Sequence, residues 1–132
     1  MCTTVLLVSD HARVRTGVRA LLEGLPDVCV VAAPTSVSEC LHEMAARRPQ
    51  IAVIDSGTDG LGARHLVAAI HARVPGTGII VLAPEPAPWH VHALLDAGAR
   101  GFLLKETAAR ELEPALHAVM AGRTYLGDRV AC

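Results

Sequence analysis

Charged side chains stand directly after three apolar runs that lie far apart in the sequence. Asp10, Asp55 and Lys105 each follow such a run. If the three runs are strands of one sheet, two carboxylates and one ammonium group meet at one edge of it, where they form either a functional site or only a solvated ion pair at the loop ends. One pair about 4 Å apart, at an effective dielectric constant of roughly 20, contributes up to ~4 kcal/mol before desolvation. Ser9 stands where a second carboxylate could accompany Asp10.

Short apolar runs alternate along the chain with stretches in which apolar residues recur at helical spacing. The runs predict strands over residues 4–8, 28–32, 51–54, 79–82 and 101–104. The helical patterns predict a first helix that stops near Gly24, further helices over 36–48, 61–74 and 89–97, and a last helix that ends near Ala121. Ser36 is expected to cap the second helix, and Pro114 to delay or kink the last one.

Continuously apolar strands joined by crossover helices predict a parallel sheet that is buried on both faces. We therefore predict an α/β three-layer sandwich, a flavodoxin-like doubly wound (βα)5 fold with strand order 2-1-3-4-5. The first and fifth helices are expected to share one face of the sheet. In such sheets the functional site lies outside the carboxyl ends of the strands. Residues 1–121 are assigned to this domain, and residues 122–132 to the start of a linker.

The composition argues against several classes of protein. Twelve Lys and Arg residues against thirteen Asp and Glu residues leave no basic stripe, so we expect no direct contact of this domain with nucleic acid. The apolar runs are too short to span a bilayer and no export leader is evident, so a cytoplasmic protein without membrane contact is expected. The cysteines at 2, 29, 40 and 132 are scattered, and reduced thiols are expected. No nucleophile–base pair, phosphate-cradling glycine motif or zinc spacing predicts an enzyme.

Four segments resemble the receiver domain of two-component response regulators, most closely the NarL/LuxR type of transcription regulator. They are VLLVSDHARVRTGVRALLEG, RRPQIAVID, ALLDAGARGFLLKE and AGRTYLGDRVA, the last of which resembles the start of a linker to a DNA-binding domain. The resemblance implies that Asp55 is the position that a histidine kinase phosphorylates. It also implies Mg²⁺ held by an acidic pair after the first strand, and a phosphoryl group held by a hydroxyl after the fourth strand and by Lys105.

The sequence departs from this family pattern around the metal. Ser9 replaces one member of the acidic pair, so only Asp10 remains there. Mg²⁺ requires an octahedron of hard oxygens, and a hydroxyl is a weaker ligand than a carboxylate. The loop after Asp55 is shorter than the family's, which makes Gly57 an uncertain source of the backbone carbonyl. We therefore expect a weakened or lost Mg²⁺ site at Asp10, Asp55 and Gly57, with no other cofactor.

The parts that would respond to phosphorylation are altered too. Ala83 takes the place of the hydroxyl residue after the fourth strand, and Phe102 keeps an aromatic ring at the repacking position but has no hydroxyl. Three prolines stiffen the loop at 84–88. Trp89, at the start of the fourth helix, is a candidate contact for a ligand or a partner.

We therefore interpret the chain as an atypical (degenerate) receiver, and three hypotheses follow, of which the third is the conventional alternative. The first is a phosphorylation-independent domain that dimerises and positions a C-terminal helix-turn-helix DNA-binding domain of the same full-length chain, with no need of a histidine kinase. The second is a sensor in which a small molecule occupies the space left by Ser9, Ala83 and the short loop. The third is an ordinary Mg²⁺-dependent phosphoreceiver modified on Asp55.

Overall fold

A computed structural model describes residues 2–56, 63–84, 88–128 and 130 of the chain. Its strands are β1 (Thr3–Val8), β2 (Val28–Ala32), β3 (Ile51–Asp55), β4 (Gly78–Ala83), β5 (Gly101–Leu104) and β6 (Tyr125–Leu126). Its helices are α1 (Ala12–Glu23), α2 (Val37–Arg47), α3 (Ala63–Arg73), α4 (Pro88–Ala97) and α5 (Ala108–Met120), with a 3-10 turn at Lys105–Thr107 before α5. The predicted alternation of strands and helices is confirmed.

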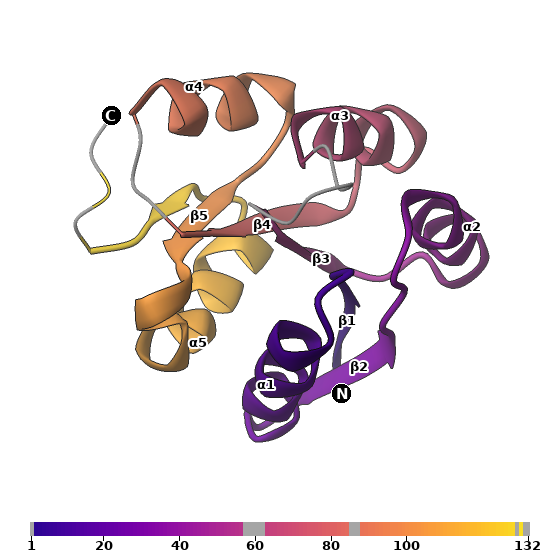
Figure 1. Cartoon of the computed structure of the whole chain (residues 1–132), viewed down its shortest axis with the longest axis horizontal. Coiled ribbons are helices and arrows are strands. Elements are labelled where there is room, and N and C mark those ends of the chain that lie inside the picture. Colours follow the sequence, from indigo (N-terminus) through magenta and orange to yellow (C-terminus); the bar gives the residue numbers. More distant parts are fainter. Residues whose placement is uncertain (1, 57–62, 85–87, 129, 131–132) are drawn as a thin grey trace.

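All strands belong to one parallel sheet in the order β2-β1-β3-β4-β5-β6. The predicted order of the first five strands is therefore confirmed, and β6 is an addition that we did not predict. It pairs with β5 through Gly101 opposite Tyr125 and Phe102 opposite Leu126. Residues 125–126, which we assigned to a linker, thus extend the sheet along its β5 edge (Figure 1).

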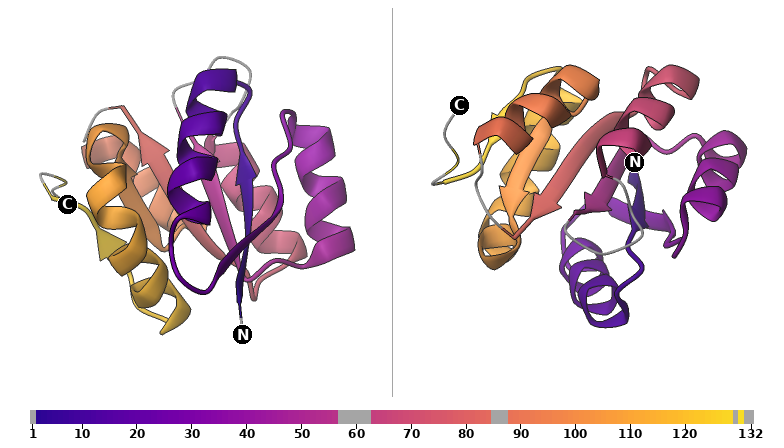
Figure 2. Two further views of the ribbon diagram at one scale, coloured as in Figure 1. Left: turned by 90° about the horizontal axis from the view of Figure 1, so that it is seen from below. Right: turned by 45° about the horizontal axis from the view of Figure 1, so that its top comes forward.

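The helices form two layers, one on each face of the sheet. Helices α1 and α5 cover one face, and α2, α3 and α4 cover the other (Figures 1 and 2). Each layer has its own core: β1, β3 and β4 alternate their side chains, so Leu7 and Val53 face α1 and α5, whereas Leu6 and Ile54 face the other helices. The predicted pairing of the first and fifth helices on one face is confirmed.

Two local predictions had different outcomes. The Ser36 side chain caps α2 by accepting a hydrogen bond from the N–H of Glu39 at 3.2 Å, as expected. The prediction that Pro114 delays the last helix is wrong, because α5 begins at Ala108 and continues through Pro114. The apolar side chains of α5 on both sides of the proline are buried against β4 and β5, and this burial offsets the hydrogen bond that the proline nitrogen cannot donate.

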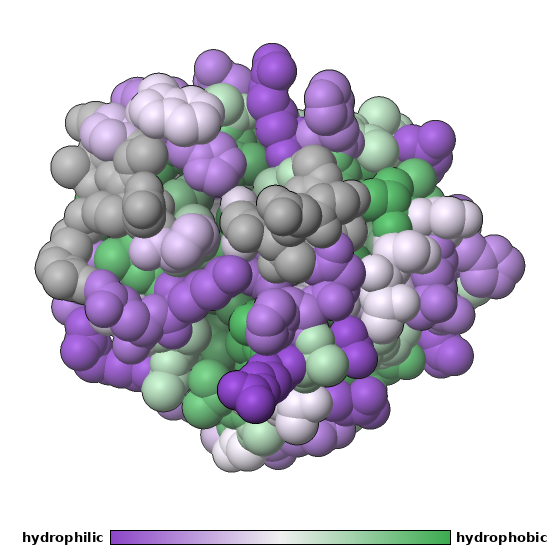
Figure 3. Space-filling model, viewed as in Figure 1, coloured by the Kyte–Doolittle hydropathy of each residue, from purple (hydrophilic) through white to green (hydrophobic). Residues whose placement is uncertain are grey.

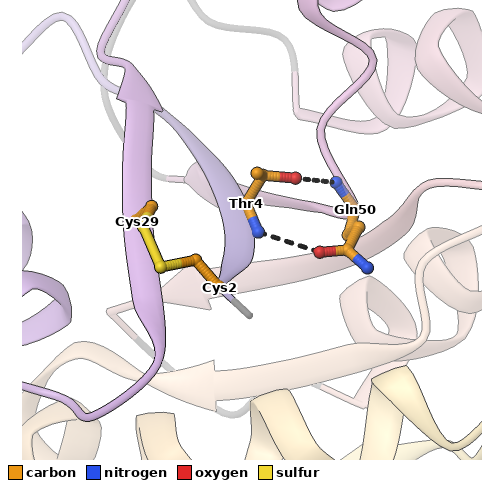
Figure 4. The surroundings of a disulfide bond; sticks show 4 residues. All are labelled: Cys2, Thr4, Cys29 and Gln50. Carbon is orange, nitrogen blue, oxygen red and sulfur yellow. Dashed lines mark hydrogen bonds between the residues drawn. A yellow bond between two sulfur atoms is a disulfide. The ribbon is translucent and has the colours of Figure 1, made fainter.

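The expectation of reduced thiols is wrong for two of the cysteines. Cys2 and Cys29 form a disulfide between the start of β1 and the edge strand β2 (Figure 4). Their Cα atoms lie 5.7 Å apart because the parallel pairing of β1 with β2 places Thr4 opposite Cys29. Cys40 is a free thiol inside the core, and burial raises its pKa to about 12. Cys132 lies outside the described residues.

Beside the disulfide, Thr4 and Gln50 hold β1 against the start of β3. The backbone N–H of Thr4 donates to Oε1 of Gln50 and the backbone N–H of Gln50 donates to Oγ1 of Thr4, both at 3.0 Å (Figure 4). Within the described part of the chain, no helix combines the length and the apolar character needed to cross a bilayer.

Candidate functional site

Asp55 is the last residue of β3 and lies in the middle of the sheet, between β1 and β4. Its side chain is fully buried. It is there because β3 is apolar on both faces and ends at the edge where β1 and β4 also end. A buried carboxylate must be compensated by cations or hydrogen-bond donors, since desolvation of an isolated charge is costly. The partners of Asp55 therefore decide what this site can do.

Lys105 is the first of these partners. Its Nζ atom lies 2.5 Å from Oδ1 of Asp55, and its side chain is 28 % exposed. Lys105 directly follows β5, so two strand ends that are 50 positions apart in the sequence meet through the sheet and bring Asp55 and Lys105 together at one edge, as the sequence predicts. The pair neutralises the buried carboxylate with the chain's own ammonium group.

Ser9 is the second partner. Its hydroxyl donates a hydrogen bond to Oδ2 of Asp55 at 2.8 Å, and the serine is fully buried. A hydroxyl has one proton, so the oxygen acts as acceptor toward the backbone N–H of His11, 3.1 Å away. Arg15 adds a hydrogen bond from its guanidinium group to the Ser9 carbonyl at 3.1 Å. Ser9 thus serves as a neutral donor where the family has an acid, and both Asp55 oxygens are engaged within the protein.

The other predicted metal ligands are Asp10 and Gly57. Asp10 is exposed, and none of the hydrogen bonds or ion pairs among the described residues joins it to Asp55. Gly57 lies outside the described residues. Across residues 2–56, 63–84, 88–128 and 130, no three His, Cys, Asp or Glu side chains are placed to hold a metal together. In the described arrangement a lysine ammonium and a serine hydroxyl contact the two oxygens of the carboxylate that would bind Mg²⁺.

The two positions expected to respond to phosphorylation are both inside the core. Ala83, at the end of β4, is fully buried and its methyl group cannot donate to a phosphoryl oxygen. Phe102 on β5 is also fully buried. The ring of His90 meets it edge-on, with centroids 6.1 Å apart and planes at 84°. Sequence reasoning missed His90, because its contact with Phe102 joins two different elements of the fold.

Trp89 lies at the start of α4 and is the most exposed large hydrophobic side chain of the described residues, at 74 %. Its ring lies against the ring of His90, with centroids 5.2 Å apart and planes tilted by 30°. Trp89, His90 and Phe102 therefore form a continuous series of rings from the surface to the core. Trp89 also borders a groove of about 550 Å³ between α3 and α4, together with Arg64, His65 and His92. Residues 85–87 of the predicted proline loop lie outside the described residues.

The space in which we expected a small molecule is not open where it borders Ser9 and Ala83. Ser9 and Ala83 are fully buried, and the Ser9 hydroxyl is bonded to Asp55. The third element of that expectation, the short loop, falls at residues 57–62 and lies outside the described residues. A different groove, between α1 and α5, reaches Lys105 and is discussed below.

A second buried carboxylate, Glu111 of α5, was not predicted from the sequence. Its Oε2 accepts from the Thr107 hydroxyl at 2.5 Å, and its Oε1 accepts from the Tyr125 hydroxyl at 3.1 Å and from the N–H of Asp128 at 2.8 Å. Burial raises the pKa of this carboxyl, but the three hydrogen bonds and the charge of Arg110 outweigh burial and leave the pKa below its ordinary value. Glu111 thereby anchors β6 to α5. No local sequence signal marks this role, because Tyr125 and Asp128 lie 14 and 17 positions away from Glu111.

Comparison with known proteins places these features in a family. A model of the response regulator receiver domain matches residues 5–117. The transcriptional regulatory protein UhpA of Salmonella typhimurium is 36% identical over 128 residues, which cover 97% of this chain and 64% of UhpA. The chain therefore spans less than two thirds of that relative.

Solved structures with the same fold agree. A LuxR-family two-component response regulator from Aurantimonas sp. SI85-9A1 has a TM-score of 0.91 at 27% identity, covering 98% of this chain and 93% of that one. A structure of two RcsB dimers bound to two parallel DNAs has a TM-score of 0.87 at 26% identity, covering 98% of this chain and 66% of that one.

Proposed function

This chain belongs to the response regulator receiver domain family, and we propose that it is an atypical receiver that acts without phosphorylation of Asp55. In the full-length protein it would control a C-terminal helix-turn-helix DNA-binding domain, and so transcription, through dimerisation or through a bound ligand. The LuxR-type relatives are transcriptional regulators, and RcsB has been solved as dimers on DNA, which supports this assignment.

One observation carries the proposal: Ser9 and Lys105 together engage both oxygens of a fully buried Asp55. Attack of Asp55 on a phosphoryl donor would need one oxygen to leave its partner. The phosphorylated product would then carry extra negative charge beside a single ammonium group. The second acid that would help to bind Mg²⁺ is replaced by Ser9, and the hydroxyl that would donate to a phosphoryl oxygen is replaced by the methyl group of Ala83. A site compensated by its own residues has no need of a metal to stay folded.

The second candidate is an ordinary phosphoreceiver. Retention of Asp55 and Lys105 at the ends of β3 and β5 favours it, since these are the phosphoacceptor and the phosphoryl-binding lysine of the family pattern. In that case Lys105 would exchange Asp55 for a phosphoryl oxygen, and Asp10 would turn inward to bind Mg²⁺.

Amide NMR spectra separate the two candidates. The domain is titrated first with Mg²⁺ and then with beryllofluoride, which mimics a phosphoryl group on an aspartate. We expect at most weak shifts near Asp10 and none that saturate at Asp55. Saturable shifts that spread from Asp55 to Phe102 and α4 would refute the proposal. Intact mass after incubation with acetyl phosphate and Mg²⁺ gives a second readout, with Asp55→Asn as the control.

Dimerisation is measured on the same sample. Sedimentation velocity over a concentration series reaching high micromolar is expected to give a reversible dimer whose dissociation constant is insensitive to Mg²⁺ and beryllofluoride. A strictly monomeric chain at those concentrations would remove dimerisation as the mechanism and leave ligand binding as the only phosphorylation-independent route.

A further inference from the structure

A groove between α1 and α5 runs along the surface to Lys105. It has a volume of about 390 Å³, and among its lining residues are Val14, Gly17 and Leu21 of α1, Leu82 of β4, and the cations Arg13 and Lys105. Leu21 is 36 % exposed and is one of three large hydrophobic side chains so exposed in the described residues. In Figure 3, hydrophobic side chains reach the surface between α5 and α1 and are bordered by hydrophilic ones.

Gly17 makes room for this groove. A Cβ atom added at Gly17 would have no atom within 4 Å, so the groove beside the middle of α1 is open. Glycine in a helix interior costs roughly 0.5–1 kcal/mol relative to alanine. Neither local backbone geometry nor close packing of a neighbour requires a glycine at this position.

The charges of the groove are of one sign. Arg13 and Lys105 line it, and no acidic residue is among the described residues that do so. No hydrogen bond or ion pair within the described part of the chain involves the Arg13 side chain. An apolar channel with cations and no acid is complementary to a molecule that has an apolar body and one anionic group.

Lys105 links the groove to the centre of the sheet. The same ammonium group that lines the groove lies 2.5 Å from Asp55. An anion in the groove would offer Lys105 a second partner and would weaken its hold on Asp55. Binding in the groove and the state of Asp55 are therefore coupled, and the coupling acts equally in both directions.

We propose that the groove between α1 and α5 binds a small amphiphile that has a short apolar chain and an anionic head group held by Arg13 and Lys105. This inference rests on the proposed function, of which it specifies the ligand and its route to Asp55. A volume of about 390 Å³ is at the small end of the range for ligand sites, which limits the apolar part to a short chain.

Amide NMR titration of the 132-residue chain tests this with octanoate and octyl phosphate as probes. We expect saturable shifts at Arg13–Leu21, Lys105 and Ala108 with at least one of them, and the two arms identify the preferred head group. Octanol, which has the same chain without the charge, is expected to bind roughly five- to tenfold more weakly, because two partly exposed charge contacts are lost. Octyltrimethylammonium is expected not to bind.

Four variants locate the site and test its coupling to Asp55. Gly17→Leu fills the groove and is expected to lower octanoate affinity by about tenfold or more, while helix propensity keeps the fold intact. Arg13→Glu is expected to do the same, whereas Arg19→Glu on the same helix, where Arg19 pairs with Glu23 outside the groove, is expected to leave affinity unchanged. Asp55→Asn releases Lys105 and is expected to tighten octanoate binding by about threefold.

The proposal is overturned if octanol binds as tightly as octanoate and octyl phosphate, if Gly17→Leu binds normally, or if Asp55→Asn has no effect on affinity. It is also overturned if the α1 amides shift on dilution of a dimer and not with the probes, since the groove would then receive a second copy of the chain. These outcomes are independent of the beryllofluoride experiment, so failure here is distinguishable from failure of the proposed function.

Discussion

The Asp55 site is self-compensated, meaning that Lys105 and Ser9 of the same chain provide the cation and the hydrogen-bond donor for the buried carboxylate. Substitution of Ser9 by aspartate should make this site depend on a divalent cation. Ser9 is fully buried and its hydroxyl lies 2.8 Å from Asp55. Ser9→Asp removes this donor and places a second carboxylate beside the first. Lys105 already pairs with Asp55, and the Arg15 guanidinium is already hydrogen-bonded to the Ser9 carbonyl.

The size of the effect follows from the geometry. Two carboxylates about 4 Å apart at an effective dielectric constant of roughly 20 repel each other by about 4 kcal/mol. Loss of a hydrogen bond to a charged group adds about 1.5–3 kcal/mol, and attraction of the new acid to Lys105 offsets part of the sum. We expect a net loss of about 3 kcal/mol in the free energy of unfolding. Mg²⁺ at a hundredfold excess over its dissociation constant should restore about 2.7 kcal/mol.

Urea denaturation measures both quantities. Wild type and Ser9→Asp are unfolded in EDTA and in Mg²⁺ at the same ionic strength, with Ser9→Asn as the control that changes size without adding charge. The midpoint of Ser9→Asp should fall by about 1–3 M in EDTA, given a slope of roughly 1–3 kcal/mol/M, and should recover in Mg²⁺. The wild-type and Ser9→Asn midpoints should not depend on Mg²⁺.

Two results would refute the reasoning. If Ser9→Asp is as stable as wild type in EDTA, the site tolerates a second charge and the donor role of Ser9 is unimportant. If wild type itself gains stability from Mg²⁺ at the concentration that rescues the variant, then Asp10 and Asp55 already bind the cation and the self-compensated description of the site is wrong.

Three other substitutions test the remaining contacts. Lys105→Ala removes the cation that pairs with the buried Asp55 and should lower the free energy of unfolding by about 3 kcal/mol, measured by urea denaturation, whereas Arg47→Ala, which breaks an exposed pair with Glu43, should cost less than about 0.5 kcal/mol. Cys2→Ser removes the crosslink to Cys29 and should lower stability by about 3.5 kcal/mol under oxidising conditions, from the entropy of the 27-residue separation; equal stability of variant and wild type without reductant would show that the bond does not form. Glu111→Gln tests the pH dependence of stability. Because the pKa of Glu111 is depressed in the folded state, its ionised form contributes stability above the ordinary glutamate pKa, and this contribution is lost as pH falls through the folded-state pKa. The free energy of unfolding should therefore fall more steeply over this range for wild type than for the variant, and parallel curves would contradict this.

Much of the fold could be predicted because its signal is local. Continuously apolar runs such as Ile51–Ile54 identify strands buried on both faces, and helical spacing in between identifies the crossovers. The Ser36 cap involves residues three apart. The strand β6 escaped prediction because it is two residues long, and it exists through pairing with β5 and through the anchor at Glu111, neither of which is visible nearby in the sequence.

The sequence by itself determined the parallel sheet, the placement of Asp55 and Lys105 at strand ends, and the loss of an acid at Ser9 and of a hydroxyl at Ala83. Only the tertiary structure decided what Ser9 does. Ser9 and Asp55 are 46 positions apart, and whether a hydroxyl donates to a carboxylate depends on strand register and side-chain direction to within a fraction of an ångström. The same reason applies to the disulfide of Cys2 with Cys29 and to the edge-on contact of His90 with Phe102. Hydrophobic periodicity specifies which residues are buried, whereas the pairing of polar groups within the buried site follows from the geometry of the assembled sheet.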